Sequence, residues 1–200
     1  MSIRRAVDIL AAMGGLVSSL PVLMMIAAAV ATIDGRPVLF MQVRSGRGGR
    51  PLRIVKFRTM RESFDPTGRL LPDGSRVTRL GRFLRLTRID ELPQLWNLLV
   101  GDMSIVGPRP LLPATIAEAA EAGRLRGRVR PGLTGLAQVS GNTLLSTEEK
   151  IALDNWYIAN RSLALDAAIL WRTLRVSLLG ERRDLHMLER AHARCPDRRG

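Results

Sequence analysis

Two adjacent carboxylates stand where the chain could attack a phosphate. Asp90 and Glu91 shortly precede Pro93, in a segment rich in arginine. Proline is tolerated in the first turn of a helix, so Pro93 predicts a helix that begins near Asp90 to Leu92. The positive end of the helix dipole and the nearby arginines would both favour the ionised form of Asp90. An ionised aspartate is a competent nucleophile toward phosphorus.

Such an attack requires cations, because an anion must approach a phosphate that is itself negatively charged. Arg85, Arg88 and Arg109 can supply fixed positive charge. A divalent ion held by carboxylate and phosphate oxygens can supply more, and Mg²⁺ is the expected ion because no histidine is nearby in the sequence. An Asp-Glu pair before proline is also a common helix cap, so the proposed chemistry needs support from the rest of the chain.

The segment before the acid pair predicts a helix with a cationic face. From Thr78 the sequence TRLGRFLRLTR places arginines at every third position and large apolar residues on the opposite face. These arginines are Arg79, Arg82, Arg85 and Arg88. A solvated charged face is the usual explanation of such a pattern, but this helix leads directly into Asp90.

Composition points to anionic partners and a reducing compartment. The 200 residues carry a formal charge of +13, and of the 31 basic residues only Lys56 and Lys150 are lysines. Arginine suits bidentate contact with phosphate, although a GC-rich genome would also enrich it. Nucleic acid, anionic lipid and phosphorylated substrates all fit, but the scarcity of aromatic residues disfavours single-stranded nucleic acid. The single cysteine, Cys195, excludes an internal disulfide.

A long apolar segment begins near the N-terminus. Ile9 to Ile33 is a run of about 25 uncharged residues, long enough for a membrane helix. A secretory signal peptide fits Arg4 and Arg5 with a cleavage site at Ala29–Ala31, but the apolar core of such peptides is usually shorter. A simple membrane span conflicts with the distribution of charge, because both flanks are basic and the downstream flank is the more basic of the two.

Pro21 resolves this conflict by predicting a break in the middle of the segment. Proline lacks a backbone donor and disfavours helical geometry in the preceding residue. Each half then measures roughly 18 to 20 Å, too short to cross an apolar core of about 30 Å. The hydroxyls of Ser18 and Ser19 are available to backbone groups freed at the break. We therefore expect a re-entrant helix-break-helix that enters the membrane and returns to the same side.

The chain beyond the apolar segment alternates turn signals with short regular elements. Branched residues in 38–43 and 52–57 flank a Gly and Arg turn at 45–50, which predicts a β-hairpin. Residues 64–75 are rich in turn residues and predict a surface loop. Residues 129–142 read as a Gly and Pro loop able to offer backbone amides to an anion.

The C-terminal half predicts helices. Residues 115–130 indicate an exposed helix, and 147–160 a second one with acidic residues at its start. Residues 164–179 are amphipathic, and either a lipid headgroup layer or the protein core could cover their apolar face. The tail from 181 is basic and expected to be mobile. Its His186, His192 and Cys195 could suggest a metal, but a frayed tail is the simpler interpretation.

These motifs resemble the bacterial sugar transferases, the small monotopic polyprenyl-phosphate phosphoglycosyltransferases. The resemblance covers about residues 4–180. It rests on KFRTM at 56–60, IDELPQLWNLLVGDMSIVGPRP at 89–110 and RPGLTGLAQVSG at 130–141, with LFMQVRSG at 39–46 as a weaker match. The chain departs from the family pattern at the helix break, where Leu20 stands in place of the usual serine, and at Leu52, where an aromatic is common.

The resemblance implies an activity and roles for individual residues. It implies transfer of a sugar 1-phosphate from a nucleotide sugar, expected to be a UDP-sugar, to undecaprenyl phosphate, with Mg²⁺ as cofactor and UMP as the second product. Asp90 matches the aspartate that takes the phosphosugar covalently, and Glu91 its acidic neighbour for metal or proton handling, so both are candidate metal ligands. The residues expected to bind substrate are Lys56, Arg58, Arg85, Arg88, Arg109, Arg130, Thr134 and Gln138.

The expected fold is α+β and mostly helical. Residues 1–34 would form the re-entrant membrane helix around Ser18, Ser19 and Pro21, and 35–180 a compact cytoplasmic catalytic domain with a short β-hairpin and amphipathic interfacial helices. Residues 181–200 would form the basic tail. We expect the protein at the cytoplasmic face of a bacterial inner membrane, acting early in polysaccharide or glycoconjugate assembly, with no nucleic acid partner and a possible homodimer. The alternative is a non-catalytic basic membrane adaptor that binds anionic lipid or nucleic acid.

Overall fold

The computed structural model describes residues 2–193 and confirms a mostly helical α+β protein with a long apolar N-terminal helix. By contacts between residues, the described chain divides into two compact units. We call residues 9–42 and 53–99 the acid-pair unit, because Asp90 and Glu91 lie in it. We call residues 2–8, 43–52 and 100–193 the helical unit.

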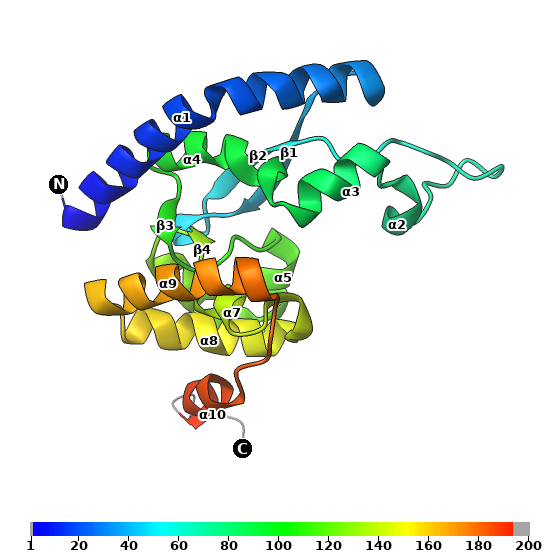
Figure 1. Ribbon diagram of the computed structural model, residues 1–200. Coiled ribbons are helices and arrows are strands. Elements are labelled where there is room, and N and C mark those ends of the chain that lie inside the picture. The colour runs from blue at the N-terminus through cyan, green and yellow to red at the C-terminus, as the bar shows by residue number, and fades with distance from the viewer. Residues whose placement is uncertain (1, 194–200) are drawn as a thin grey trace. The chain divides into compact units, whose positions relative to one another are not determined.

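Helix α1 (Ile3–Ile33) runs through Pro21 without an interruption, so the predicted break is a bend rather than a gap. Figure 1 shows this bend between the two halves of the helix. Pro21 cannot donate to the carbonyl one turn back, and the Ser18 and Ser19 hydroxyls donate instead to the Gly15 carbonyl, at 3.2 and 2.6 Å. Hydroxyls bonded to a carbonyl one turn earlier tend to bend helices, which suits a helix that curves without breaking.

The predicted β-hairpin is confirmed. Strands β1 (Leu39–Ser45) and β2 (Pro51–Phe57) pair with each other across the turn η1 (Arg47–Gly49). Gly48 and Gly49 have φ values of 68° and 74°, a region that favours glycine, so this turn needs residues without a side chain.

The acid-pair unit continues from the hairpin into short helices. These are α2 (Asp73–Arg76), α3 (Arg79–Leu86), the 3-10 helix η2 (Ile89–Gln94) and α4 (Leu95–Val100). Thr78 caps α3 by accepting from the Gly81 amide at 2.8 Å, as the predicted helix start requires. The core of the unit joins Ile26 and Val30 of α1 to Phe57 of β2 and Leu84 of α3. Leu84 of the arginine-rich helix is therefore buried against the end of α1 with Leu80 packed beside it, whereas Phe83 and Leu86 of the same helix are exposed.

The helical unit is built around two parallel strands. Strands β3 (Ser104–Val106) and β4 (Gly132–Thr134) pair with Ser104 opposite Gly132 and Val106 opposite Thr134. The helices are α5 (Pro113–Glu118), α6 (Ala120–Leu125), η3 (Arg126–Arg128), α7 (Leu136–Val139), η4 (Asn142–Leu144), α8 (Thr147–Ala159), α9 (Leu163–Leu179) and α10 (Leu185–Ala193). Ser146 and Glu149 form a capping box at the start of α8, which confirms the predicted helix there.

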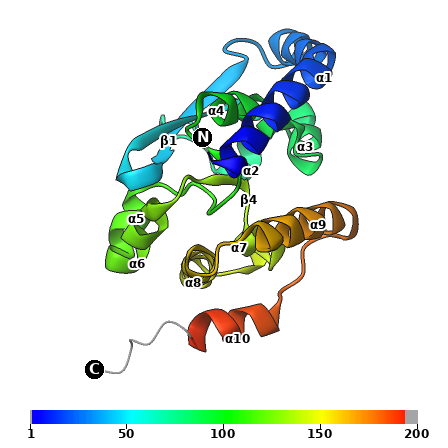
Figure 2. The same cartoon turned by 90° about the vertical axis from the view of Figure 1, so that its left-hand side faces the viewer.

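Three expectations for this unit were wrong. The single exposed helix over 115–130 is divided between α5 and α6, because Ala120 adopts a positive φ of 48°. The Gly and Pro segment at 129–142 is mostly buried and forms β4 and α7 instead of an open loop. The tail is folded as far as Ala193, because Met187, Leu188 and Ala191 of α10 are buried in the core beside α8 (Figure 2).

Helix α9 has one buried and one exposed apolar face. Ile169 is fully buried in the core of the unit, whereas Trp171, Leu174 and Leu178 are 72%, 60% and 85% exposed. The core therefore covers one side of this amphipathic helix, as one of the two interpretations predicts, and leaves a second apolar surface open, whose contact with a headgroup layer stays a prediction.

Candidate active site

The acid pair lies at the start of a helix, as predicted. Asp90 and Glu91 occupy the first turn of η2, which leads directly into α4. Arg88 precedes η2 in the left-handed conformation, with φ 59° and ψ 10°, and its carbonyl accepts from the Glu91 amide at 3.2 Å. This left-handed residue separates α3 from η2 and starts a new helix at Ile89. Asp90 is buried there, with 7% of its surface exposed.

The electrostatic setting of Asp90 differs from the sequence expectation. Burial raises the pKa of Asp90 above its ordinary value, and the neighbouring Glu91 carboxylate raises it further. Lys56, Arg85 and Arg88 lower this pKa but do not overcome the two raising effects. The helix dipole and the arginines had suggested a carboxyl held in its ionised form, but the burial of Asp90 decided the direction of the shift.

Two predicted cations are fixed beside the pair. The Lys56 Nζ lies 2.7 Å from the Glu91 Oε1, in an ion pair with little exposure of either side chain. The Arg85 Nε donates to the Thr59 hydroxyl at 2.8 Å. The contact between Arg85 and Thr59 depends on close packing of the backbone at Gly81. A Cβ at this position would lie only 2.1 Å from the Thr59 carbonyl oxygen, so no residue with a side chain fits there. Glycine at position 81 lets α3 approach the chain after β2 and aligns Arg85 with Thr59.

Arg58 has a structural function that the sequence did not suggest. Its guanidinium donates to the carbonyls of Asp34, Gly35 and Arg36, just after the end of α1, with 2.7 Å to Gly35 and 2.9 Å to Arg36. These carbonyls follow the last helical residue, so Arg58 fixes the chain where it leaves α1. Substrate binding by Arg58 stays a prediction, and its guanidinium already has three partners.

The other predicted substrate residues belong to the helical unit. Thr134 is buried, and its hydroxyl lies 2.7 Å from that of Thr173. The side-chain amide of Gln138 donates to the Leu133 carbonyl at 2.9 Å. Arg109 and Arg130 line neighbouring cavities of this unit. The structure thus brings Lys56, Arg85, Arg88, Asp90 and Glu91 together in one unit and places Arg109, Arg130, Thr134 and Gln138 in the other.

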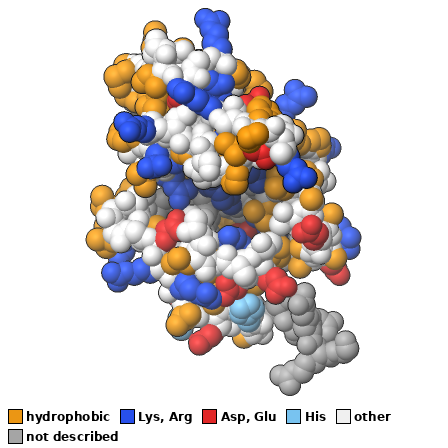
Figure 3. Space-filling view, turned by 90° about the vertical axis from the view of Figure 1, so that its right-hand side faces the viewer, with side chains coloured by type: hydrophobic (Ala, Val, Ile, Leu, Met, Phe, Trp, Pro, Cys, Tyr) orange, Lys and Arg blue, Asp and Glu red, His pale blue; other side chains and the backbone are white. Residues whose placement is uncertain are grey.

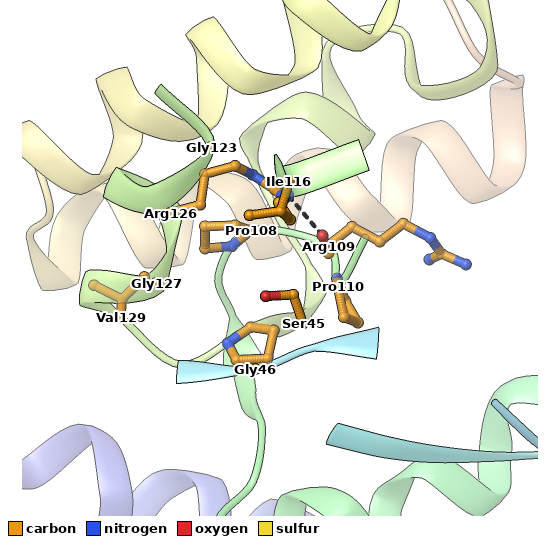
Figure 4. A pocket seen from close by; sticks show the side chains of 11 residues that line it. Ser45, Gly46, Pro108, Arg109, Pro110, Ile116, Gly123, Arg126, Gly127 and Val129 are labelled. Carbon is orange, nitrogen blue, oxygen red and sulfur yellow. Dashed lines mark hydrogen bonds between the residues drawn. The ribbon is translucent and has the colours of Figure 1, made fainter. Parts of the chain in front are cut away.

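Sequence reasoning missed a buried ion pair that holds the backbone of Arg109. Arg126 and Asp154 are 6% and 2% exposed, and two guanidinium nitrogens of Arg126 lie 2.9 and 2.7 Å from the same Asp154 oxygen. Arg126 also donates to the Arg109 carbonyl at 2.6 Å. Figure 4 shows this contact, with the Arg109 side chain pointing away from the other labelled residues. The only sequence signal was an acid among apolar positions of α8, which is common on helices.

The acid pair fits a magnesium ion better than a softer metal. Mg²⁺ is usually held by one or two carboxylates together with waters and substrate phosphates. Asp90 and Glu91 supply two adjacent carboxylates, and a cation would relieve the repulsion by which Glu91 raises the pKa of Asp90. Among residues 2–193 there is no cluster of three or more His, Cys, Asp or Glu side chains arranged to hold a metal, and Cys195 lies outside the described residues. The tail metal site thus gains no support from His186 and His192.

The described surface is both basic and apolar. On the face drawn in Figure 3, Lys and Arg side chains are spread among exposed hydrophobic ones. Helix α1 is long and apolar enough to cross a membrane by length and composition, and little of its apolar stretch is buried. Surfaces of this kind suit contact with anionic lipid.

Comparison with known proteins gives one consistent family. The model of the bacterial sugar transferase family matches residues 1–180. The chain is 44% identical over 181 residues to the Uncharacterized sugar transferase EpsL of Bacillus subtilis, with 90% of each chain covered. It is 43% identical over 185 residues to a UDP-glucose:undecaprenyl-phosphate glucose-1-phosphate transferase of Caulobacter vibrioides, covering 86% of this chain and 68% of that one. A Klebsiella pneumoniae protein of the same name is 40% identical over 184 residues, and this chain spans only 40% of its length.

Proposed function

The chain belongs to the bacterial sugar transferase family, and from this premise we propose that it moves a sugar 1-phosphate from a UDP-sugar to undecaprenyl phosphate. The names of the Caulobacter and Klebsiella relatives support these substrates. The product would be a lipid diphosphate sugar, and UMP would be released. A relative in Sinorhizobium fredii is named for exopolysaccharide production, which supports a place early in the assembly of a surface glycan.

The proposed reaction has two displacement steps at one phosphorus atom. An Asp90 oxygen attacks the sugar-bearing phosphorus of the donor, the bond between this phosphorus and the bridging oxygen breaks, and UMP leaves. A phosphate oxygen of undecaprenyl phosphate then attacks the same phosphorus and displaces the Asp90 carboxylate. Each step forms one phosphorus–oxygen bond and breaks one, so the enzyme is returned unchanged.

The observation that carries this proposal is the setting of Asp90. It is a buried carboxylate with an acidic neighbour on one side and three cations, Lys56, Arg85 and Arg88, acting on it. Burial removes much of the water that would weaken a nucleophilic oxygen, and the cations offset the repulsion of the incoming phosphate. A residue that only capped a helix would be more stable exposed to water.

Asp90 and Glu91 are the residues that would hold Mg²⁺, which supplies positive charge to the phosphate oxygens when bound. Lys56 would not bind the metal ion itself. It positions the Glu91 carboxylate through the 2.7 Å ion pair.

The contacts at the start of α1 bear on membrane topology. Arg4 pairs with Asp166 at 2.6 Å, and the Asp8 carboxylate accepts from the Ser104 hydroxyl at 2.9 Å. All four residues belong to the helical unit. The first turns of α1 are therefore on the same side of a membrane as residues 100–193.

The contacts at the other end of α1 belong to the acid-pair unit. Asp34 accepts from the Thr78 hydroxyl at 2.9 Å and pairs with Arg61 at 3.0 Å, and Arg58 binds the carbonyls of residues 34–36 just after the helix. The end of α1 is therefore on the same side of a membrane as residues 53–99. Among the described residues, α1 is the one helix long and apolar enough to cross a membrane.

We infer that both ends of α1 face one side, so that the helix enters the membrane and returns. We propose that this side is the cytoplasmic face of the bacterial inner membrane, where a soluble UDP-sugar can meet a lipid phosphate held at the interface. Labelling of cysteines introduced at Ser2 and Gly35, in a Cys195→Ser background, tests the topology. Both positions should react with an impermeant thiol reagent only in inverted vesicles, and reaction of the two from opposite sides would refute re-entry.

A covalent adduct tests the chemistry. Purified protein is incubated with Mg²⁺ and a panel of UDP-sugars but no lipid, and its intact mass is measured. We expect one donor to add the mass of a phosphosugar at Asp90, and subsequent undecaprenyl phosphate to remove it. If the protein were a basic membrane adaptor, no donor would give an adduct, and the Asp90→Asn variant would bind membranes as well as the unaltered chain. Lipid product formed by Asp90→Asn at the normal rate would refute the aspartyl mechanism.

A further inference from the structure

A large open cavity in the helical unit is lined by five arginines, of which only Arg130 is among the residues expected to bind substrate. It has a volume of about 930 Å³ and lies between the turn of the β-hairpin and the segment from α6 to η3. We call it the arginine cavity. The arginines that line it are Arg47, Arg50, Arg124, Arg128 and Arg130, and its one acidic residue is Asp102.

These five arginines make no ion pair or side-chain hydrogen bond with any other described residue, whereas Arg4, Arg126, Arg172 and Arg183 all pair with acids of the same unit. Four of the five arginines are exposed, so water weakens their mutual repulsion, but a single aspartate cannot balance five like charges. Such a set of charges is stabilised when an anion enters, because guanidinium groups bind phosphate oxygens in a bidentate manner.

The backbone brings the two arginine-bearing segments together. Gly127 packs so closely on the hairpin turn that a Cβ at this position would lie 3.3 Å from the Gly48 amide nitrogen and 3.4 Å from that of Gly49. Glycines at the contact let η3 meet the turn without side chains between them. Arg47 and Arg50 of the turn therefore share one space with Arg124 and Arg128.

The residues that line the cavity indicate that it recognises the phosphate groups of a ligand and not a nucleobase. None of the lining residues, all of which the structure describes, is aromatic, so a nucleobase would find no ring on which to stack. A single phosphate would engage one or two guanidinium groups and leave the others uncompensated. We propose that the arginine cavity binds a ligand with two or more neighbouring phosphates, through its phosphate groups.

Two sources could present this chemistry. A soluble diphosphate would enter from water, and an anionic membrane lipid with paired phosphates would present it at the headgroup layer. The inference depends on the charges of the cavity and not on the transferase proposal, so it is tested by binding and without turnover.

The test compares two variants that each remove two positive charges. Arg124→Gln with Arg128→Gln alters the cavity, and Arg69→Gln with Arg79→Gln alters exposed arginines of the acid-pair unit that line no part of it. Inorganic pyrophosphate is titrated into the full-length protein in neutral detergent without divalent metal, by calorimetry. We expect the cavity variant to bind at least about tenfold more weakly, since hydrogen bonds to charged groups are the strong ones. The control variant should bind as the unaltered chain does.

A second arm separates the two sources. Flotation compares vesicles of phosphatidylcholine alone with vesicles that also contain cardiolipin. If the cavity variant loses pyrophosphate binding but keeps its preference for cardiolipin vesicles, the ligand is soluble. If it loses the preference for cardiolipin vesicles but still binds pyrophosphate, the ligand is a lipid. Equal effects of both variants, or no effect of the cavity variant in either arm, would overturn the proposal.

A measurement on the unaltered chain guards against loss of folding. Phenylglyoxal modifies accessible arginines, and mass spectrometry reports each site. Pyrophosphate should protect Arg124 and Arg128 at concentrations that leave Arg69 and Arg79 reactive. Equal protection of all four would show that the anion binds without preference for the cavity, and the proposal would fall.

Discussion

The protein buries two aspartates in opposite ways. Asp154 in the helical unit is 2% exposed and shares one of its oxygens with two nitrogens of Arg126. Asp90 in the acid-pair unit is 7% exposed, next to a second carboxylate, with cations that act on it but do not cancel the cost of burial. Burial raises the pKa of both carboxyls, and in both cases neighbouring cations oppose it.

The difference suits a structural role for Asp154 and the nucleophilic role that we propose for Asp90. Arg126 compensates Asp154 directly and also binds the Arg109 carbonyl, so the pair fixes backbone in the core. The cations near Asp90 have other partners, since Lys56 pairs with Glu91 and Arg85 with Thr59. A carboxylate left partly uncompensated is unfavourable for stability but available to a phosphorus atom, which is a common compromise at catalytic sites.

The largest expected effect comes from Asp90→Asn. We expect turnover to fall by about three orders of magnitude or more, because the nucleophilic oxygen is lost. Since the raised pKa means that folding disfavours the ionised form, removing the charge should leave the melting temperature equal or higher at neutral pH. Lipid-product assays and thermal denaturation check the two results. A large loss of stability would mean that Asp90 is a structural residue like Asp154.

The Arg126→Ala variant should show the reverse pattern. It leaves Asp154 buried without its partner, and we expect a loss of about 3 to 5 kcal/mol in the free energy of unfolding. Adding Asp154→Asn should restore part of this loss, because the uncompensated charge is then gone. The single variant should also recover as the pH falls and Asp154 takes up a proton. Denaturant titrations at several pH values measure this, and a pH-independent loss would contradict it.

A smaller effect is expected from Glu91→Gln, seen in the pH dependence of adduct formation. Asp90 must be ionised to attack, so the rate should fall as the pH drops through its raised pKa. Removing the Glu91 charge lowers that pKa, and the midpoint should move to lower pH. Single-turnover mass spectrometry across a pH series gives the midpoint independently of the maximal rate. A midpoint that moves upward would show that Glu91 does not act on Asp90 through its charge.

The smallest effect is expected from Lys56→Met, which should move the same midpoint the other way. Lys56 lowers the pKa of Asp90, and its influence ranks below that of Glu91. The shift should therefore be upward and smaller than the downward shift of Glu91→Gln. Arg69→Gln, which removes a distant exposed charge of the same unit, serves as the control. Equal shifts in the two variants would mean that only net charge matters.

Local features of this protein were readable from the chain. Pro93 gave the start of the helix that carries the acid pair, and branched residues around a Gly and Arg turn gave the β-hairpin. The periodicity from Thr78 and the acidic residues at the start of 147–160 indicated two further helices, which the structure caps with Thr78 and Ser146. These features depend on steric preferences and hydrogen bonds among residues close in sequence, which the sequence displays directly.

Features that depend on distant contacts were not readable. The division of 115–130 into two helices and the burial of 129–142 follow from packing in the helical unit, where Gly132 and Gly135 press against Gly107. The tail was expected to fray because it is basic, but its few apolar side chains found a place in the core. The composition of a segment does not show which distant residues will pack against it.

The chain by itself determined that a carboxylate pair, a cationic helix and a long apolar segment with a proline would be present. Only the tertiary structure decided the sign of the pKa shift at Asp90, the contact of Arg58 with the chain just after α1, and the pairing of Arg126 with Asp154. The reason is that burial and charge compensation are set by residues brought together from distant parts of the chain. Residues close in sequence determine which helices and strands form. Residues brought close by folding determine the polarity of the surroundings of each charged group.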